Sequence, residues 1–264
     1  MELTRRNFIK LGMGGLVGGL VLSSVPNAIK LFAQTGTGKL SQYGDVTINP
    51  AHYWRFVVDI RKCIGCGSCL RACKAENNVP LQPEYNRTWV ERYVVDQAEN
   101  VYVDSPNAGY DGFKSEYMNL KYRDLDIRTT FFVPKLCNHC DKPPCVAVCP
   151  VGATYQNSEG VILVNRNACI GCRYCVQACP YGARYFHPTL KIVDKCTWCY
   201  HRISNGLVPA CVETCPTGAR MFGDIRDPNS SVSRAIQGEA TGILKPELGN
   251  QNKVYYLGMD KGVK

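Results

Sequence analysis

The chain has 264 residues with 16 cysteines, and its 31 Lys and Arg against 22 Asp and Glu give a formal charge of +9. A hydrophobic content of 45% with 15 tyrosines allows a buried core and excludes wholesale disorder. No stretch reaches the roughly 18 apolar residues of a spanning helix, which excludes a polytopic membrane protein. The charge by itself fits binding to nucleic acid or a membrane surface, whereas the cysteines point to metal or disulfides.

Residues 1–33 have the order of an export signal: a charged start, an apolar run and polar residues. Arg5 and Arg6 stand in Thr-Arg-Arg-Asn-Phe-Ile-Lys, which resembles the twin-arginine export signal. The apolar run Leu11–Leu22 is short and rich in glycine, so it is a poor spanning helix. The alternative is a basic flexible tail. An exported chain would be periplasmic or lie on the outer face of the cytoplasmic membrane, with the signal either cleaved or retained as an anchor.

The predicted strands follow in chain order. Residues 53–60 alternate, with Trp54, Phe56, Val58 and Ile60 on one face, which predicts a half-buried strand. Further strands are expected at 88–95, 128–133, 161–164 and 190–193, with a loop at 104–109. Cys-Pro-x-Gly-Ala recurs at Cys149, Cys179 and Cys215, and each copy should end a short helix and lead into a strand. The polar, glycine-containing tail from 223 to 264 should lie on the surface or hold a partner.

The 16 cysteines form four groups of four with none left over. Group one is Cys63, Cys66, Cys69 and Cys73; group two is Cys137, Cys140, Cys145 and Cys149; group three is Cys169, Cys172, Cys175 and Cys179; group four is Cys196, Cys199, Cys211 and Cys215. Groups one and three share the spacing C-x2-C-x2-C-x3-C, and groups two and four share Cys-Val-x-x-Cys-Pro-x-Gly-Ala. This alternation indicates an internal repeat of metal-binding modules.

A C-x2-C-x2-C loop holds three thiolates around one iron–sulfur cluster, and the fourth cysteine ligates the other cluster of a pair. Zinc also accepts thiolates, but its structural sites combine two separated C-x2-C pairs, often with His. The spacing therefore favours 4Fe-4S clusters over zinc and over a disulfide scaffold. His139 and His201 lie inside groups two and four, where we expect them beside the ligands or at the surface and not as ligands.

Aromatic residues crowd into the long interval between groups one and two. They are Tyr85, Trp89, Tyr93, Tyr102, Tyr110, Tyr117 and Phe131. They either form a partner-binding surface or pack over cluster edges that would otherwise be exposed.

Residues 53–228 resemble the four-cluster ferredoxin-like subunits of membrane-linked respiratory oxidoreductases. That family includes the iron–sulfur subunits of tetrathionate, polysulfide, arsenate and dimethyl sulfoxide (DMSO) reductases and the NrfC proteins. The resemblance rests on all 16 cysteines, on Cys-Lys-Ala-Glu-Asn-Asn-Val-Pro at 73–80, and on Phe222-Gly223-Asp224 with Asp227-Pro228. It implies an α+β fold of tandem bacterial dicluster-ferredoxin-like modules with an inserted β-containing segment.

The corresponding domain organisation has five parts. They are a twin-arginine signal peptide at 1–33, the first cluster group plus insertion at 34–136, a central dicluster ferredoxin-like module at 137–195, the fourth cluster group at 196–228, pairing with the first, and a C-terminal surface tail at 229–264.

The resemblance also implies a nested pairing of the groups, which gives four ligand sets. Set A is Cys63, Cys66, Cys69 and Cys215; set B is Cys196, Cys199, Cys211 and Cys73; set C is Cys137, Cys140, Cys145 and Cys179; set D is Cys169, Cys172, Cys175 and Cys149. The spacing is compatible with this pairing, but pairing of group three with group four would also be short along the chain.

The implied function is that of an electron-transfer subunit with four 4Fe-4S clusters and no catalytic residues. Its partners would be an NrfD/PsrC-like integral membrane subunit that handles quinone and a catalytic subunit, either a molybdopterin enzyme or a multihaem cytochrome. Nucleic acid is not an expected partner, since the excess of Lys and Arg compensates the anionic clusters. Lys62, Lys74, Arg173 and Lys195 are candidates for tuning cluster potentials, although solvated surface charge is expected for most of them.

Two alternatives belong to other classes. One is a cysteine-rich zinc module that mediates interactions. The other is a chain that itself catalyses a redox reaction, which no flavin, molybdopterin or haem motif in the sequence supports.

Overall fold

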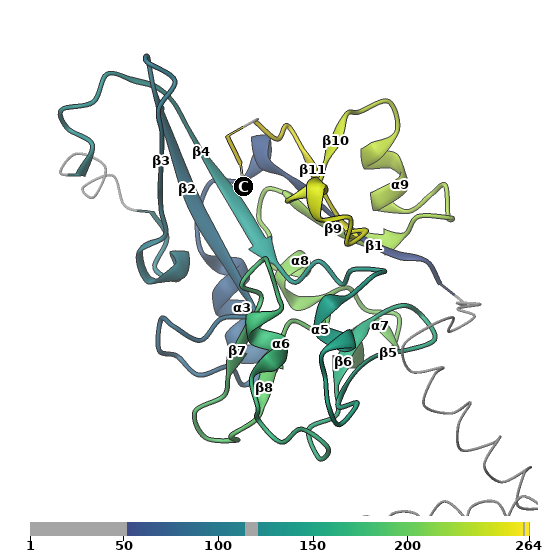
Figure 1. Cartoon of the computed structure of the whole chain (residues 1–264). Helices are drawn as coiled ribbons and strands as arrows, with labels where there is room; N and C mark the ends of the chain where they lie inside the picture. Colours follow the sequence, from purple (N-terminus) through teal and green to yellow (C-terminus); the bar gives the residue numbers. More distant parts are fainter. Residues whose placement is uncertain (1–51, 114–120, 261, 264) are drawn as a thin grey trace, which may run out of the picture. The chain divides into compact units, whose positions relative to one another are not determined.

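The computed structural model describes residues 52–113, 121–260, 262 and 263 (Figure 1). The predicted signal peptide at 1–33 lies outside these residues. Four small sheets and several short helices make up the described part of the chain. None of the helices in these ranges combines the length and apolar character needed to cross a membrane.

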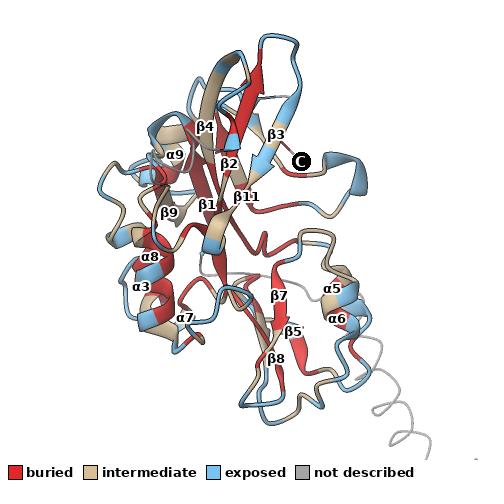
Figure 2. Ribbon diagram, turned by 90° about the vertical axis from the view of Figure 1, so that its left-hand side faces the viewer, coloured by how far each residue is buried: buried red, intermediate tan, exposed pale blue. Residues whose placement is uncertain are grey.

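The largest sheet joins the two ends of the described chain. Its order is β10 (Thr241–Gly242), β11 (Val254–Leu257), β1 (Trp54–Asp59) and β9 (Arg220–Asp224). Figure 2 shows β1 buried along most of its length, and Phe56, Val57 and Val58 are fully buried. The prediction of a half-buried strand is wrong, because helix α9 (Ser231–Ile236) covers the face that was expected to be exposed, with Val232 packed on Val57.

The predicted surface tail at 229–264 is wrong for residues 252–257, most of which are buried. Strand β11 runs parallel to β1, with Phe56 opposite Val254 and Val58 opposite Tyr256. Val254 and Tyr256 are fully buried, and the 3-10 helix η3 (Pro246–Leu248) lies between β10 and β11. The C-terminal segment is therefore an inner strand of the main sheet.

The interval between groups one and two forms a sheet of its own, in the order β3, β2, β4. Its strands are β2 (Thr88–Asp96), β3 (Val101–Asp104) and β4 (Ile127–Leu136), and the 3-10 helix η2 (Pro106–Gly109) follows β3. The strands predicted at 88–95 and 128–133 are confirmed, whereas β3 was not predicted. Tyr93 is buried and stacks on Phe131 with ring centroids 5.3 Å apart, so this aromatic pair packs internally. Tyr117 lies outside the described residues.

The remaining elements are short and surround the cysteines. The helices are η1 (Ile60–Lys62), α3 (Ser68–Asn77), α5 (Pro144–Ala147), α6 (Tyr174–Gln177), α7 (Tyr200–Ile203) and α8 (Ala210–Glu213). The strands are β5 (Thr154–Gln156) paired with β6 (Ile162–Val164), and β7 (Arg184–Phe186) paired with β8 (Val193–Lys195).

The predicted strand at 161–164 is confirmed as β6, as are the strands after Cys149, Cys179 and Cys215, which are β5, β7 and β9. The strand predicted at 190–193 is wrong, because β8 begins only at Val193 and Leu190 is 47% exposed.

Candidate metal centres

The loops of groups one and three have the same backbone shape. Gly65 and Gly171 occupy equivalent places with φ of 67° and 70°, and Gly67 and Arg173 follow with φ of 74° and 66°. At Gly171 a Cβ atom would lie 2.4 Å from the carbonyl oxygen of Lys191, so only glycine fits. The sequence repeat is therefore a repeat of loop conformation.

Helix packing decides which groups meet. Helix α3, which carries Cys69 and Cys73, packs against α8, which carries Cys211. Helix α5, which carries Cys145, packs against α6, which carries Cys175. Groups one and four thus come together, as do groups two and three.

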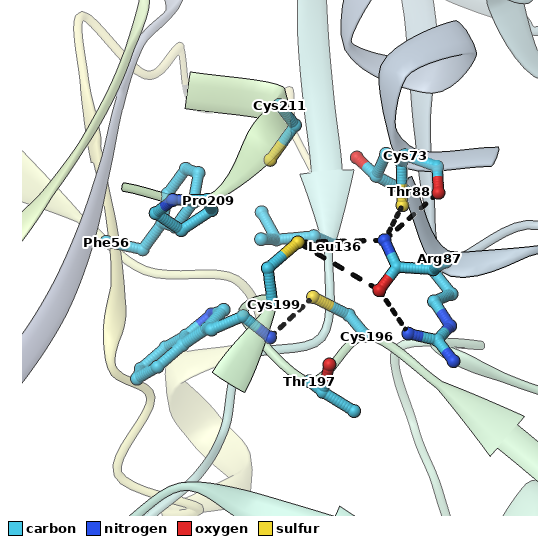
Figure 3. Close-up of a pocket in the computed structure, with 12 residues that line it drawn as sticks. Phe56, Cys73, Arg87, Thr88, Leu136, Cys196, Thr197, Cys199, Pro209 and Cys211 are labelled. Carbon is cyan, nitrogen blue, oxygen red and sulfur yellow. Dashed lines mark hydrogen bonds between the residues drawn. The ribbon is translucent and has the colours of Figure 1, made fainter. Parts of the chain in front are cut away.

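The cysteines of set B line one small cavity (Figure 3). Cys73 reaches it from α3, Cys211 from α8, and Cys196 and Cys199 from the chain between β8 and α7. Burial, and then the neighbouring thiols of Cys211 and Cys196, raises the pKa of Cys73 well above its ordinary value. Thiolates in such surroundings require positive charge to neutralise them, which iron supplies.

Sets A and C are also assembled from separate groups. Burial, followed by Cys69 and Cys215, raises the pKa of Cys63 to about 11, so Cys215 of group four lies beside group one. In set C, burial raises the pKa of Cys140 to about 12, with further contributions from Cys137, Cys145 and Cys179.

Cys179 of group three therefore lies among the cysteines of group two. Burial, and then Cys137, raises its pKa as well.

In the region of set D, Cys175 and Cys169 belong to one small apolar cluster together with Cys145. Cys172 is exposed, unlike the other 15 cysteines. Set D thus contains the most exposed cysteine of the chain.

Contacts between sets give their order. Burial raises the pKa of Cys211 in set B to about 12, and Cys69 of set A lies close enough to raise that pKa further. Burial likewise raises the pKa of Cys196 in set B, and the neighbouring Cys137 of set C raises it further. Cys145 of set C likewise lies beside Cys175 of set D. The sequence of neighbours is A, B, C, D.

The donor set suits 4Fe-4S clusters. All 16 cysteines are free, and the backbone N–H groups of Thr154, Val193 and Trp198 donate to the sulfur atoms of Cys149, Cys169 and Cys196. Such hydrogen bonds to sulfur are typical of cluster ligands and influence their potentials.

Several buried side-chain donors near the cysteines have no hydrogen-bond partner among the described residues. They are Asn138 Nδ2, Arg184 Nε, Trp198 Nε1 and Arg220 Nη1. Buried donors are nearly always satisfied, so these atoms fit a bound group with acceptor sulfur atoms.

Asn77 connects set B to a buried ion pair. Its amide nitrogen faces the sulfur atoms of Cys73, at 3.7 Å, and Cys199, at 3.6 Å. Arg87 donates to the side-chain oxygen of Asn77 at 2.8 Å and forms two hydrogen bonds with Asp194. Arg87 therefore orients the amide so that its N–H groups point toward sulfur. Sequence reasoning recorded the motif at 73–80 without assigning this role.

Lys74 of that motif has a structural role. Lys74 is buried and donates to three backbone carbonyls, those of Pro80, Gln82 and Tyr85. Lys74 therefore supplies hydrogen-bond donors to backbone carbonyl groups of a loop that has no regular secondary structure. Lys74 is not solvated surface charge.

The other three candidates for tuning cluster potentials differ in their exposure. Lys62 is half-exposed and lies 3.6 Å from Asp59, and Arg173 is exposed and stacks over Phe186. Lys195 is fully buried. Exposure thus agrees with surface charge for two of the four candidates and not for Lys74 and Lys195.

The two histidines also differ. His139 is fully buried and stacks on Trp198 with ring centroids 4.1 Å apart, and its Nδ1 accepts a hydrogen bond from the Ile162 N–H. His201 is half-exposed and hydrogen-bonds Glu76 at 2.6 Å. His139 therefore packs between the loops of groups two and four, and His201 lies at the surface.

Comparison with known proteins agrees with this arrangement. Two family models of a 4Fe-4S dicluster domain match residues 62–153 and 128–225. A tetrathionate reductase subunit of Salmonella typhimurium is 42% identical over 214 residues, which are 80% of this chain and 75% of that protein. The protein of the same name from Archaeoglobus fulgidus is 41% identical over 234 residues, 88% of this chain and 92% of that protein.

Protein NrfC of Escherichia coli is 37% identical over 227 residues, covering 85% of this chain and 89% of NrfC. Two dicluster domains imply four 4Fe-4S clusters, and the 16 cysteines fit this number at four ligands for each cluster. The chain belongs to the ferredoxin-like iron–sulfur subunits of respiratory oxidoreductases, which transfer electrons and are not the catalytic subunits.

Proposed function

We propose that this chain relays single electrons between a quinone-handling membrane subunit and a catalytic subunit, with sets A, B, C and D each holding one 4Fe-4S cluster. The observation that carries the proposal is the order of the sets, because each set has cysteines beside those of the next. A bound cluster supplies reversible one-electron redox chemistry.

The protein's own residues supply the remaining requirements. Backbone and side-chain N–H groups donate to the ligand sulfur atoms, and Asn77 is held toward set B by Arg87. All four cysteines of set B and three of set C are buried, which excludes water from the middle of the series, whereas three cysteines of set A are partly exposed and Cys172 of set D is exposed. Solvent access at the two ends of the series supports electron exchange with one partner at set A and with another at set D.

The partners we propose are an NrfD/PsrC-like integral membrane subunit and a molybdopterin enzyme or multihaem cytochrome. The relatives' names support assembly into such complexes, since two are named as subunits of a tetrathionate reductase. We also propose export by the twin-arginine route, on the sequence around Arg5 and Arg6. Cell fractionation tests the export: the chain is expected outside the cytoplasm, and recovery from the cytoplasm alone would contradict it.

Electron exchange with quinone tests the relay. In the complex purified from its own membranes, a soluble menaquinol analogue is expected to bleach the visible cluster absorption, or the corresponding quinone to restore it after dithionite reduction. The chain separated from its partners should exchange electrons with quinone much more slowly. A chain that purifies from membranes without partners, with absorption that neither quinol nor quinone changes, would contradict the proposal.

A further inference from the structure

Two buried arginines occupy equivalent places in the repeat. Arg184 lies five residues after Cys179 and Arg220 five residues after Cys215, so both extend the motif to Cys-Pro-x-Gly-Ala-Arg. Each is the first residue of the strand that follows, β7 or β9, and each is about 5% exposed or less. The third copy of the motif has Thr154 at this place.

Arg220 lies between sets A and B. Despite burial, which acts to lower it, the pKa of Arg220 is raised by Cys69, Cys211 and Cys63. Cys63 and Cys69 belong to set A, and Cys211 belongs to set B. One end of the guanidinium is fixed by a hydrogen bond of 2.8 Å from Nη2 to Thr88 Oγ1, while Nη1 has no partner among the described residues.

Arg184 lies between sets C and D in the same manner. Its Nη2 donates to the sulfur of Cys145 at 3.0 Å, and its Nη1 donates to Thr154 Oγ1 at 3.2 Å. Against the effect of burial, Cys145, Cys175 and Cys137 raise its pKa. Cys137 and Cys145 belong to set C, and Cys175 belongs to set D.

Lys195 occupies the remaining junction, between sets B and C. It is fully buried, and its Nζ donates to the backbone carbonyls of Ile162 and Cys196. Burial lowers the pKa of Lys195, whereas Cys137 of set C and Cys196 of set B lie close enough to oppose that shift. Each pair of neighbouring sets thus has one buried basic side chain between its cysteines.

None of these three side chains forms an ion pair with a carboxylate in the part of the chain that the structure describes. The buried basic residues Arg87 and Lys253 differ, because they pair with Asp194 and Asp141. The partners of the three junction residues are hydroxyl, carbonyl and cysteine sulfur atoms. Their positive charges are therefore left to neutralise the anionic ligand sets.

The geometry points to Arg220, Lys195 and Arg184 as junction cations, positioning residues that each raise the reduction potentials of the two clusters on either side. This inference rests on the proposed function. Reduction adds one electron to a cluster, whose net charge with its four thiolates goes from about −2 to about −3 without making or breaking a protein bond. A buried cation shared by two clusters favours the more negative state of both and screens their mutual repulsion.

Redox titration of purified, fully loaded protein, followed by electron paramagnetic resonance, tests the inference. Arg220→Gln is expected to lower the equilibrium constant for reduction at least tenfold at two clusters, which is about 59 mV for a one-electron couple. Arg184→Gln should do the same at the other two. Lys195→Met should lower the reduction potentials of the clusters in sets B and C, which are one cluster from each of these pairs. Arg166→Gln changes an exposed residue and is the control, so it should leave all four reduction potentials unchanged.

The conservative variants separate charge from structure. Arg220→Lys and Arg184→Lys keep the positive charge, so their potentials should stay close to those of the wild type even if a Gln variant loses iron. Intact clusters with unchanged potentials in the Gln variants would overturn the inference, as would loss of clusters in the Lys and Gln variants alike. Wild-type protein without iron would instead overturn the proposed function, so that the two failures are distinguishable.

Discussion

The double variant Cys215→Ala with Cys63→Ala is expected to keep about three intact four-iron clusters, because both cysteines belong to set A and one cluster is lost. Cys215→Ala with Cys211→Ala should keep only about two, since Cys211 belongs to set B although it lies in the same cysteine group as Cys215. Mössbauer spectroscopy of ⁵⁷Fe-loaded protein counts the intact clusters. The structural basis is the proximity of Cys215 to Cys63 and Cys69.

A third pair of changes distinguishes the alternative pairing. Cys215→Ala with Cys172→Ala should leave about two intact clusters if group four pairs with group one, and about three if it pairs with group three. The nested arrangement would be contradicted if the double variant at Cys215 and Cys63 lost two clusters and the double variant at Cys215 and Cys172 lost only one. The packing of α3 on α8 and of α5 on α6 favours the nested one.

Replacing Arg87 by Met is expected to destabilise the protein by about 3–5 kcal/mol, because it leaves the carboxylate of Asp194 buried without its partner. The side chains of both residues are less than a tenth exposed, and they meet at 2.8 Å. In a domain of this size the loss corresponds to a fall of roughly 6–20 °C in the midpoint of anaerobic thermal unfolding. The variant also frees Asn77, which Arg87 orients toward the sulfur atoms of set B.

Two controls accompany the Arg87 variant. Arg123→Met removes one partner of an exposed pair with Asp124 and should leave the midpoint unchanged. Arg87→Met combined with Asp194→Asn removes the uncompensated charge and should recover much of the loss. Equal midpoints for Arg87→Met and Arg123→Met would show that the buried pair contributes no stability.

The cysteine loops could be predicted because they are local. Three ligands lie within seven residues in groups one and three, and the conformation depends on glycines that the sequence displays, such as Gly65 and Gly171. The strands after Cys-Pro-x-Gly-Ala follow from the same local turn chemistry. Extending this motif by one position would have identified Arg184 and Arg220, the signal that the sequence analysis missed.

Long-range pairing could not be predicted in the same way. Strand β11 joins β1 across about 200 residues of sequence, and nothing in Val-Tyr-Tyr-Leu specifies a parallel partner or burial on both faces. Strand β8 ends in Asp194 and Lys195, residue types that disfavour strands, and the reason for their burial is visible only in their partners, Arg87 and the cysteines. The contact of Asn77 with the cysteine sulfur atoms was likewise unpredictable, because a polar residue at the end of a helix is common and needs no ligand to explain it.

Metal and sulfide analysis of the purified full-length chain tests the central claim most directly. The protein is prepared anaerobically, and iron, zinc and acid-labile sulfide are measured on the same sample. Four clusters predict about 16 iron and about 16 sulfide per chain, with brown absorption that dithionite bleaches. Stoichiometric zinc without sulfide would contradict the account and establish the cysteine-rich zinc module in its place.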